Sequence, residues 1–197
     1  MTQAKVRFTS IEEYAALETS DLPECRFELV DGVIIEMGAE NLHNIEIASF
    51  LFSMLLQFVP HYLIHRGTEI EVSSYSVTCR QPDLMVLTED TRHAMRRNQR
   101  SLITQMMPAP RLVIEVVSPG DESSDNYQRD YIDKRAEYAA RSIPEYWLID
   151  PIRQLVMVLC LKGGQYQETV YKGGSCVISP TFPALELTAE QILNAAQ

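Results

Sequence analysis

Residues 112–117 read Leu-Val-Ile-Glu-Val-Val and are followed by Ser118-Pro119-Gly120. A short, nearly uniform aliphatic run with such a boundary is typical of a strand covered on both faces, as in the central sheet of an α/β protein. Glu115 lies inside this run, where a carboxylate loses several kcal/mol of solvation unless a cation or hydrogen-bond donors compensate it. The segment therefore predicts a buried central strand whose carboxylate has a metal-binding or catalytic role. The alternative is a strand-end position at which Glu115 pairs with an arginine.

Segments on both sides of this strand carry the signals of further strands and helices. Asp31-Gly32 between two apolar runs is a tight-hairpin signature, and the apolar positions of 41–59 recur at helical spacing. Strands are also expected at 68–77, 83–87 and 145–150, helices at 9–18, 125–141 and from Thr188 onward, and a hairpin at 155–161 and 166–171. This order predicts an α/β fold with a central mixed β-sheet flanked by helices and with N- and C-terminal hairpins.

The length of 197 residues is sufficient for one domain with a substantial core. No linker, repeat or low-complexity stretch divides the sequence, so we expect a single domain over 1–197. No apolar run approaches the roughly 20 residues that cross a bilayer. The first residues, MTQAKVRFTS, lack the basic start and apolar stretch of a signal peptide. These features predict a cytoplasmic protein with no membrane partner.

The net charge of −10 argues against a protein that simply coats nucleic acid, since such binding depends on neutralising phosphates. An enzyme can still use a local basic surface. Arginines concentrate at Arg92, Arg96, Arg97 and Arg100. Such residues are usually a solvated face, but they are the first candidates here for a surface that contacts phosphate.

Two further acids belong to predicted strands. Asp83 follows Pro82 and opens the strand 83–87. Alone it reads as a turn aspartate, but two carboxylates at the ends of neighbouring strands can chelate one hard divalent cation, and Mg²⁺ prefers this donor type. Glu28 lies between apolar residues in the first hairpin, where an outward-facing strand position is the simpler interpretation. Asp83 and Glu115 therefore form the first candidate metal pair.

Asp130, Lys134 and Tyr138 follow i, i+4, i+8 spacing in the predicted helix 125–141 and share one face. The spacing by itself favours an ordinary solvated ion pair between the first two. His43 and Asn44, near the start of the helix 41–59, are more typical of a capping or surface role than of metal binding.

Several well-known catalytic motifs are absent from the sequence. It contains no GxxxxGK[ST] loop, no GxGxxG after a strand, no HExxH and no GxSxG. Phosphate-loop nucleotide hydrolysis, Rossmann-type dinucleotide binding, zinc proteolysis and serine hydrolysis are therefore disfavoured.

The order and spacing of the polar residues resemble a Uma-family restriction-endonuclease-like protein, a branch of the PD-(D/E)XK nuclease superfamily. The resemblance covers about 10–193 and implies a restriction-endonuclease-like core with a Mg²⁺-dependent (or Mn²⁺-dependent) phosphodiesterase site. It rests on Glu28, Pro82-Asp83, Leu-Val-Ile-Glu115-Val-Val-Ser-Pro, Asp130-x3-Lys134-x3-Tyr138 and Pro144-Glu-Tyr-Trp-Leu-Ile-Asp-Pro.

The resemblance assigns roles residue by residue. It implies that Asp83 is the aspartate of the PD element and that Glu115 is the acid of the (D/E)XK element. These two carboxylates and the backbone carbonyl of Val116 are then the metal ligands. The superfamily's usual lysine lies two residues after the acid, but Val117 occupies that position. The resemblance implies that Lys134 in the following helix replaces it.

The same resemblance makes Glu28 a fourth catalytic residue, either a metal ligand through water or an anchor for the other groups. The implied reaction is metal-assisted hydrolysis of DNA phosphodiester bonds, with nucleic acid as the partner. A homodimer is a reasonable hypothesis because cutting both strands of a duplex favours two-fold symmetry. Two alternatives remain open: a non-catalytic protein that uses the fold for binding or assembly, and a metal-dependent phosphodiesterase that acts on RNA or nucleotides.

Overall fold

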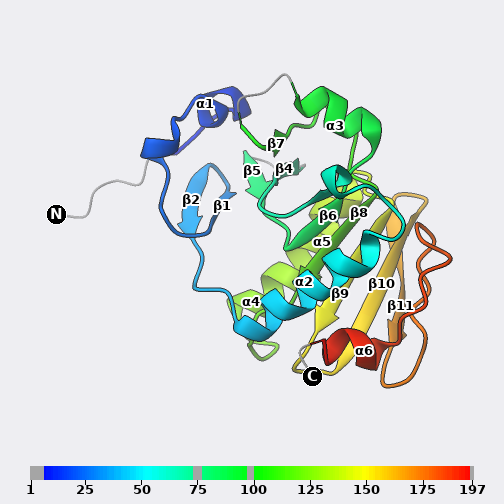
Figure 1. Cartoon of the computed structure of the whole chain (residues 1–197). Helices are drawn as coiled ribbons and strands as arrows, with labels where there is room; N and C mark the ends of the chain where they lie inside the picture. Colours follow the sequence, from blue (N-terminus) through cyan, green and yellow to red (C-terminus); the bar gives the residue numbers. More distant parts are fainter. Residues whose placement is uncertain (1–6, 73–76, 97–99, 196–197) are drawn as a thin grey trace.

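In the computed structural model, which describes residues 7–72, 77–96 and 100–195, the predicted central strand lies within a six-stranded mixed sheet. β8 (Leu112–Val116) lies between antiparallel β6 and parallel β9. The order of the sheet is β11-β10-β9-β8-β6-β3 (Figure 1). Its other strands are β3 (Ile64–His65), β6 (Leu84–Val86), β9 (Glu145–Asp150), β10 (Leu155–Lys162) and β11 (Gln165–Tyr171).

The N-terminal hairpin belongs to a second, five-stranded sheet of order β2-β1-β5-β4-β7. Asp31 and Gly32 form its turn, both with positive φ, as the tight hairpin turn requires. The strands are β1 (Phe27–Val30), β2 (Val33–Glu36), β4 (Glu69–Val72), β5 (Thr78–Arg80) and β7 (Leu102–Ile103). The α/β class, the mixed pairing and both terminal hairpins are confirmed, but the strands form two sheets where one central sheet was expected.

The expected single strand over 68–77 is wrong in the described residues. β4 ends at Val72, and β5 begins at Thr78 and runs antiparallel to it; 73–76 lie outside the described residues. Arg80, expected in a connection, is part of β5. The alternation of polar and apolar residues continues through both strands, so the pattern alone does not mark the reversal.

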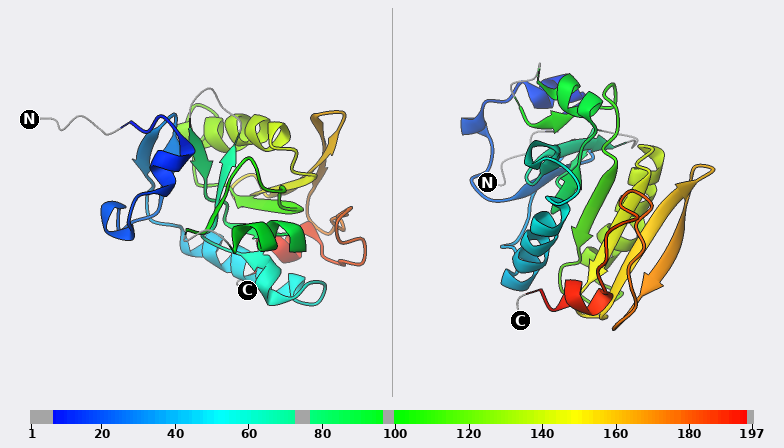
Figure 2. Two further views of the ribbon diagram at one scale, coloured as in Figure 1. Left: turned by 90° about the horizontal axis from the view of Figure 1, so that it is seen from above. Right: turned by 45° about the vertical axis from the view of Figure 1, so that its right-hand side comes forward.

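Helices cover both faces of the six-stranded sheet, as the view from above shows (Figure 2). α2 (Leu42–Leu55) and α6 (Ala189–Leu193) lie on one face, and α5 (Lys134–Ala140) lies on the other. Successive side chains of a strand point to opposite faces of its sheet, so those of β8 pack alternately on the two sides. Leu112, Ile114 and Val116 pack in the core that contains α2, whereas Val113 and Val117 pack in the core that contains Tyr138 of α5.

The helix expected at 125–141 consists of three consecutive segments: α4 (Asp125–Tyr127), the π-helical turn η3 (Gln128–Asp133) and α5. The remaining helices are α1 (Ile11–Ala15), α3 (Glu89–Met95) and the short 3-10 helices η1 (Thr19–Asp21) and η2 (His61–Leu63). Thr188 begins α6 with the expected capping box. None of the helices among the described residues combines the length and apolar character needed to cross a membrane.

Candidate active site

The pairing of β6 with β8 brings the two predicted metal ligands together. Leu84 is paired with Ile114 in this antiparallel ladder, and continuing the register by one residue puts Asp83 opposite Glu115. Both side chains are buried. Asp83 Oδ2 accepts a hydrogen bond of 2.7 Å from the backbone N–H of Val116, so the side chain continues the ladder where β6 has not yet begun.

Lys134 reaches this carboxylate pair from the helix. Its Nζ lies 2.8 Å from Glu115 Oε2 and 3.4 Å from Asp130 Oδ1. Tyr138, one turn further along α5, donates a hydrogen bond of 2.6 Å to Glu115 Oε1. All four side chains are buried. The predicted shared face of this helix is therefore real, whereas the interpretation as a solvated ion pair is wrong, because the face packs on the sheet.

Glu28 enters the cluster from the five-stranded sheet. Its Oε1 lies 3.3 Å from Lys134 Nζ, and its Oε2 accepts a hydrogen bond of 2.9 Å from Arg80. Arg80 in turn makes two hydrogen bonds of 2.7 Å to Glu137. Glu28 is only 1% exposed, so the outward-facing strand position is wrong. β1 presents Glu28 toward Lys134 of α5, and Arg80 of β5 contacts it, so the cluster joins both sheets and the helix.

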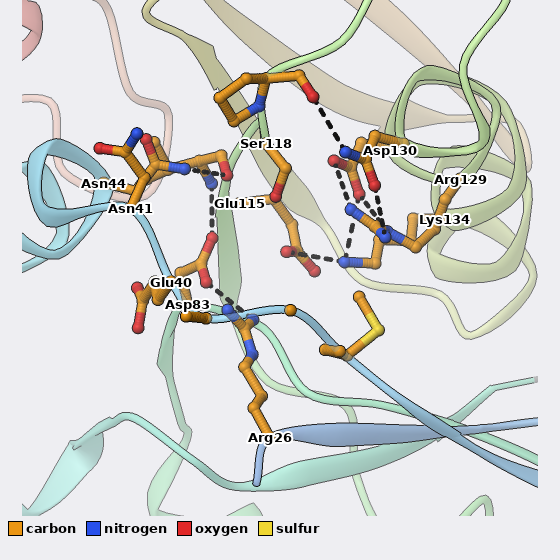
Figure 3. Close-up of a pocket in the computed structure, with 16 residues that line it drawn as sticks. Arg26, Glu40, Asn41, Asn44, Asp83, Glu115, Ser118, Arg129, Asp130 and Lys134 are labelled. Atoms are coloured by element: carbon orange, nitrogen blue, oxygen red, sulfur yellow. Dashed lines mark hydrogen bonds and ion pairs between the residues drawn. The ribbon is translucent and has the colours of Figure 1, made fainter.

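A cavity of about 190 Å³ opens on one side of the cluster. Its lining includes Asp83, Glu115, Val116 and Lys134. Figure 3 shows the side chains of Asp83, Glu115 and Lys134 around this cavity. Glu28 is not among the lining residues. The cavity therefore exposes the two carboxylates and the lysine, while Glu28 contacts the lysine from behind.

Burial and charge act differently on the three central groups. Complete burial, with the nearby carboxylates, raises the pKa of Glu115 to about 7, and Lys134 only partly offsets this effect. Burial also favours the neutral form of Glu28, but the charges of Lys134 and Arg80 outweigh it and lower its pKa to about 2. Burial would lower the pKa of Lys134, yet the carboxylates around it hold that pKa above its usual value. Lys134 therefore remains protonated, and of the two carboxylates Glu115 is the one whose ionised form is disfavoured.

The π-helical turn η3 sets the direction of several charged groups. Asp130 lies within this turn, and Lys134 follows directly after it. Arg129 donates hydrogen bonds of 2.8 and 3.1 Å to the two oxygens of Asp130 and also lines the cavity. π-helical turns occur frequently at functional sites, and here the turn brings one anion and two cations to the edge of a cavity.

Several lining residues were not expected at the site from the sequence, among them Arg26 and Asn44. Arg26 donates a hydrogen bond of 2.8 Å to Asp83 Oδ1. Asn44 is buried and donates hydrogen bonds of 3.2 Å to the carbonyls of Val116 and Val117. Asn44 therefore has neither the capping nor the surface role that was expected; Asn41 caps α2. The helical period of the buried face could have found Asn44, which lies one turn before buried Ala48, whereas no local pattern marks Arg26.

The basic stretch expected to contact phosphate does not reach this cavity. Arg100 pairs with Glu69 at 2.7 Å, and Arg92 stacks over the ring of Tyr62. Neither they nor Arg96 line the cavity, and Arg97 lies outside the described residues. The arginines that do line it are Arg26 and Arg129.

The carboxylate ligands at the cavity suit a hard divalent cation, but they are few. Among the described residues, no three His, Cys, Asp or Glu side chains gather closely enough to form a metal site by themselves. Mg²⁺ usually takes one or two carboxylates and keeps water and substrate oxygens as its other ligands. Asp83 and Glu115 supply that number at a cavity. The residues present therefore fit Mg²⁺.

A mixed sheet with helices on both faces, and with acids and a lysine gathered at one cavity, defines a restriction-endonuclease-like fold. The chain is similar to a crystal structure described as that of "a putative nuclease belonging to DUF820" from Anabaena variabilis ATCC 29413. The TM-score is 0.72 over 95% of this chain and 98% of the other, at 20% identity.

The sequence profile of the Uma2 family, described as "Putative restriction endonuclease", matches residues 11–190. The chain therefore belongs to the Uma2 family. No curated protein matches it with significant similarity.

Proposed function

We propose that the protein is a Mg²⁺-dependent nuclease that hydrolyses DNA phosphodiester bonds. The observation that carries the proposal is the convergence of Asp83, Glu115 and Lys134 at one cavity from three separate elements. Membership of a nuclease family supports hydrolysis of a phosphodiester. DNA as the partner, action in the cytoplasm and a homodimeric state are parts of the same proposal. A monomer by sedimentation under cleavage conditions would contradict the last of these.

In this proposal Asp83, Glu115 and the backbone carbonyl of Val116 hold the metal, with Mn²⁺ able to replace Mg²⁺. The metal supplies Lewis-acid stabilisation of the charge on the reacting phosphate. The hydrogen bonds from Asn44 fix the carbonyls of Val116 and Val117 at the end of β8. The hydrogen bond from Tyr138 fixes the orientation of the Glu115 carboxylate.

Lys134 stabilises negative charge that develops on the phosphate and orients the attacking water, because its ammonium remains protonated and lines the cavity. A general-base role does not suit a lysine whose pKa is raised. Glu28 acts as a positioning residue, because it contacts Lys134 and Arg80 but does not line the cavity.

The sheet geometry explains how a helix lysine can replace the superfamily's usual one. Side chains two residues apart on a strand point to the same face, so Glu115 and Val117 both face α5. Val117 packs in the core on that face. Lys134 enters the same space from α5 and places its ammonium beside Glu115. Lys134 therefore differs from the superfamily's usual lysine in its position in the sequence, but it lies on the same face of the sheet.

One observation favours the non-catalytic alternative. Each of the four carboxylate oxygens of Asp83 and Glu115 already contacts a donor: Arg26, Val116 N–H, Tyr138 or Lys134. A metal must therefore share or displace these contacts. A protein that uses the cluster only to join its sheets and helix would need no metal at all.

Metal binding and cleavage together test the proposal. Calorimetry should show Mg²⁺ or Mn²⁺ binding that disappears in Glu115→Ala. Plasmid DNA should be cleaved with Mg²⁺ and not with EDTA, and Glu115→Gln should reduce cleavage to background. Glu168→Gln, which removes an exposed carboxylate from β11, is the matched control and should cleave normally. Cleavage of RNA alone would move the assignment to the RNA alternative, and no metal binding together with no cleavage of either polymer would support the non-catalytic one.

A further inference from the structure

A second cavity, of about 390 Å³, adjoins the first. The two cavities share Arg26, Glu40 and Asp83 among their lining residues, so they meet at the proposed metal ligand Asp83. Arg66, in the connection between β3 and β4, lines only the second cavity. A group bound there is therefore next to whatever occupies the first cavity.

The first cavity is too small to enclose a nucleotide. Its volume of about 190 Å³ is below the roughly 300–1,000 Å³ of cavities that enclose small molecules. It has room for a phosphate group with a cation and water, but not for the sugar and base attached to it. The rest of the substrate must extend outward, and the second cavity offers one such path past Asp83.

Arg66 is charged, accessible and weakly engaged. Its side chain is 36% exposed. Its guanidinium donates to the carbonyl of Asp83 at 3.3 Å, to the hydroxyl of Ser49 at 3.4 Å and to Glu40 Oε1 at 3.5 Å. These distances are at the long end for hydrogen bonds. The contrast is Arg80, which makes hydrogen bonds of 2.7–2.9 Å to two carboxylates and is buried.

Glu40 places a carboxylate beside this guanidinium, which is the kind of group that a phosphate can replace. A guanidinium binds carboxylate and phosphate oxygens through the same paired N–H donors. The distance of 3.5 Å makes Glu40 a weak partner that a phosphate oxygen could displace. Arg26, whose side chain is 28% exposed, lies at the boundary between the two cavities.

We infer that Arg66 forms a subsite for the phosphate next to the scissile one, so that the enzyme requires a polymer strand with neighbouring phosphodiesters. The inference rests on the proposed nuclease function, because it takes the first cavity as the position of the scissile phosphate. Arg26 spans the two positions, and Glu40 competes with the bound phosphate. Loss of Arg66 should therefore weaken binding of the strand, and loss of the charge on Glu40 should strengthen it.

Binding without metal tests the subsite separately from cleavage. A short fluorescein-labelled DNA oligonucleotide is titrated in EDTA, where metal-dependent hydrolysis cannot run, and its anisotropy is measured. A second oligonucleotide alternates phosphodiester and methylphosphonate linkages, so that every charged linkage has neutral neighbours. Wild type should bind the fully charged strand more tightly, and Arg66→Gln should lose roughly tenfold in affinity for it and discriminate little between the two strands. Glu40→Gln should change the affinity in the opposite direction.

Arg135→Gln is the matched control for loss of one positive charge. Arg135 is also 36% exposed and also pairs with a glutamate, Glu168, but it lines neither cavity. If it weakens binding as much as Arg66→Gln, the effect is one of net charge and the subsite is overturned. Equal affinities of wild type and Arg66→Gln, or no binding by wild type, overturn it too.

Cleavage with Mg²⁺ separates the two proposals. Wild type should cleave the fully charged oligonucleotide, while bis(p-nitrophenyl) phosphate, a single diester, should be a poor substrate. Absence of all metal-dependent cleavage, together with Arg66-dependent binding in EDTA, would refute the nuclease function and leave an anion subsite in place. Cleavage without Arg66-dependent binding would refute only the subsite.

Discussion

The ammonium of Lys134 lies 2.8 Å from Glu115, on the same face of the six-stranded sheet to which Val117 also points. The lysine comes from a helix and the glutamate from a central strand, and both are buried. The pair therefore exists only when α5 is packed on the sheet. One contact thus links the packing of the helix to the charge of the candidate active site.

Replacing Lys134 by Met should destabilise the protein as well as inactivate it. Removal of one partner from a buried ion pair costs about 3–5 kcal/mol, because the other charge remains uncompensated. Glu115 and Glu28 would both lose their shared cation. Urea unfolding should show the loss of stability, and cleavage should fall by roughly 10²–10³-fold if the lysine stabilises developing charge.

The double variant Lys134→Met with Glu115→Gln separates these two effects. It removes the lysine and one uncompensated carboxylate together, so it should regain part of the lost free energy of unfolding. It should remain inactive. Recovery of cleavage in parallel with stability would show that neither Lys134 nor the charge of Glu115 is needed for catalysis.

The stability of the metal-free protein should depend on pH through Glu115. Its pKa is raised from an ordinary 4.5 to about 7 in the folded state, so the folded state binds more protons than the unfolded state between these values. Stability from this group is therefore present below pH 4.5 and is lost as pH rises to 7, by an amount on the order of a few kcal/mol. The free energy of unfolding should be measured at several pH values for wild type and Glu115→Gln. The loss of stability between pH 4.5 and 7 that comes from this group should occur only in wild type.

Glu28 should have the opposite effect at lower pH. Its pKa is lowered to about 2, so its contribution to stability is present above pH 4.5 and is lost as pH falls toward 2. Glu28→Gln should thus reduce the free energy of unfolding at neutral pH and show a weaker acid transition. An unchanged acid transition in Glu28→Gln would show that the buried contacts with Lys134 and Arg80 do not control its ionisation.

Patterns local to one strand or one helix predicted a large part of this cluster. Glu115 interrupts an aliphatic strand, and Asp130, Lys134 and Tyr138 share a helical face; both features are present in the structure. Pairing of strands 83–87 and 112–117 could be expected, but the antiparallel register that sets Asp83 opposite Glu115 could not. Register depends on which strands become neighbours, and the sequence alone does not determine that choice.

Contacts between the two sheets could not be predicted from the sequence patterns. Arg26 directly precedes β1 of the five-stranded sheet, and Asp83 directly precedes β6 of the six-stranded sheet. Their hydrogen bond depends on how the two sheets pack, and neither periodicity nor charge spacing records that packing. Arg66 could not be recognised for the same reason. The arginines at 92–100 lie close together in the sequence, but those that the structure describes line neither cavity.

Asp83→Asn should abolish metal binding while preserving the fold. The amide oxygen can still accept the hydrogen bond from the Val116 N–H, but the carboxylate charge is lost. Calorimetry with Mg²⁺ should show no binding. The thermal unfolding midpoint should fall only moderately, because the lost ion pair involves Arg26, whose side chain is 28% exposed. Asp90→Asn, in the exposed first turn of α3, is the control and should bind Mg²⁺ as wild type does. Retained binding in Asp83→Asn would mean that the metal site lies elsewhere.

Arg26→Gln should increase the affinity for metal and decrease the catalytic efficiency. Arg26 donates to Asp83 Oδ1, so it competes with a cation for one oxygen of the proposed metal ligand. Its removal should increase the affinity for Mg²⁺ in calorimetry. The same guanidinium lines both cavities and should help to hold phosphate, so kcat/KM for DNA should fall, mainly through KM. A simple loss of both metal affinity and activity would instead show that Arg26 is needed to keep Asp83 in position, since a positioning role predicts that the two quantities decrease together.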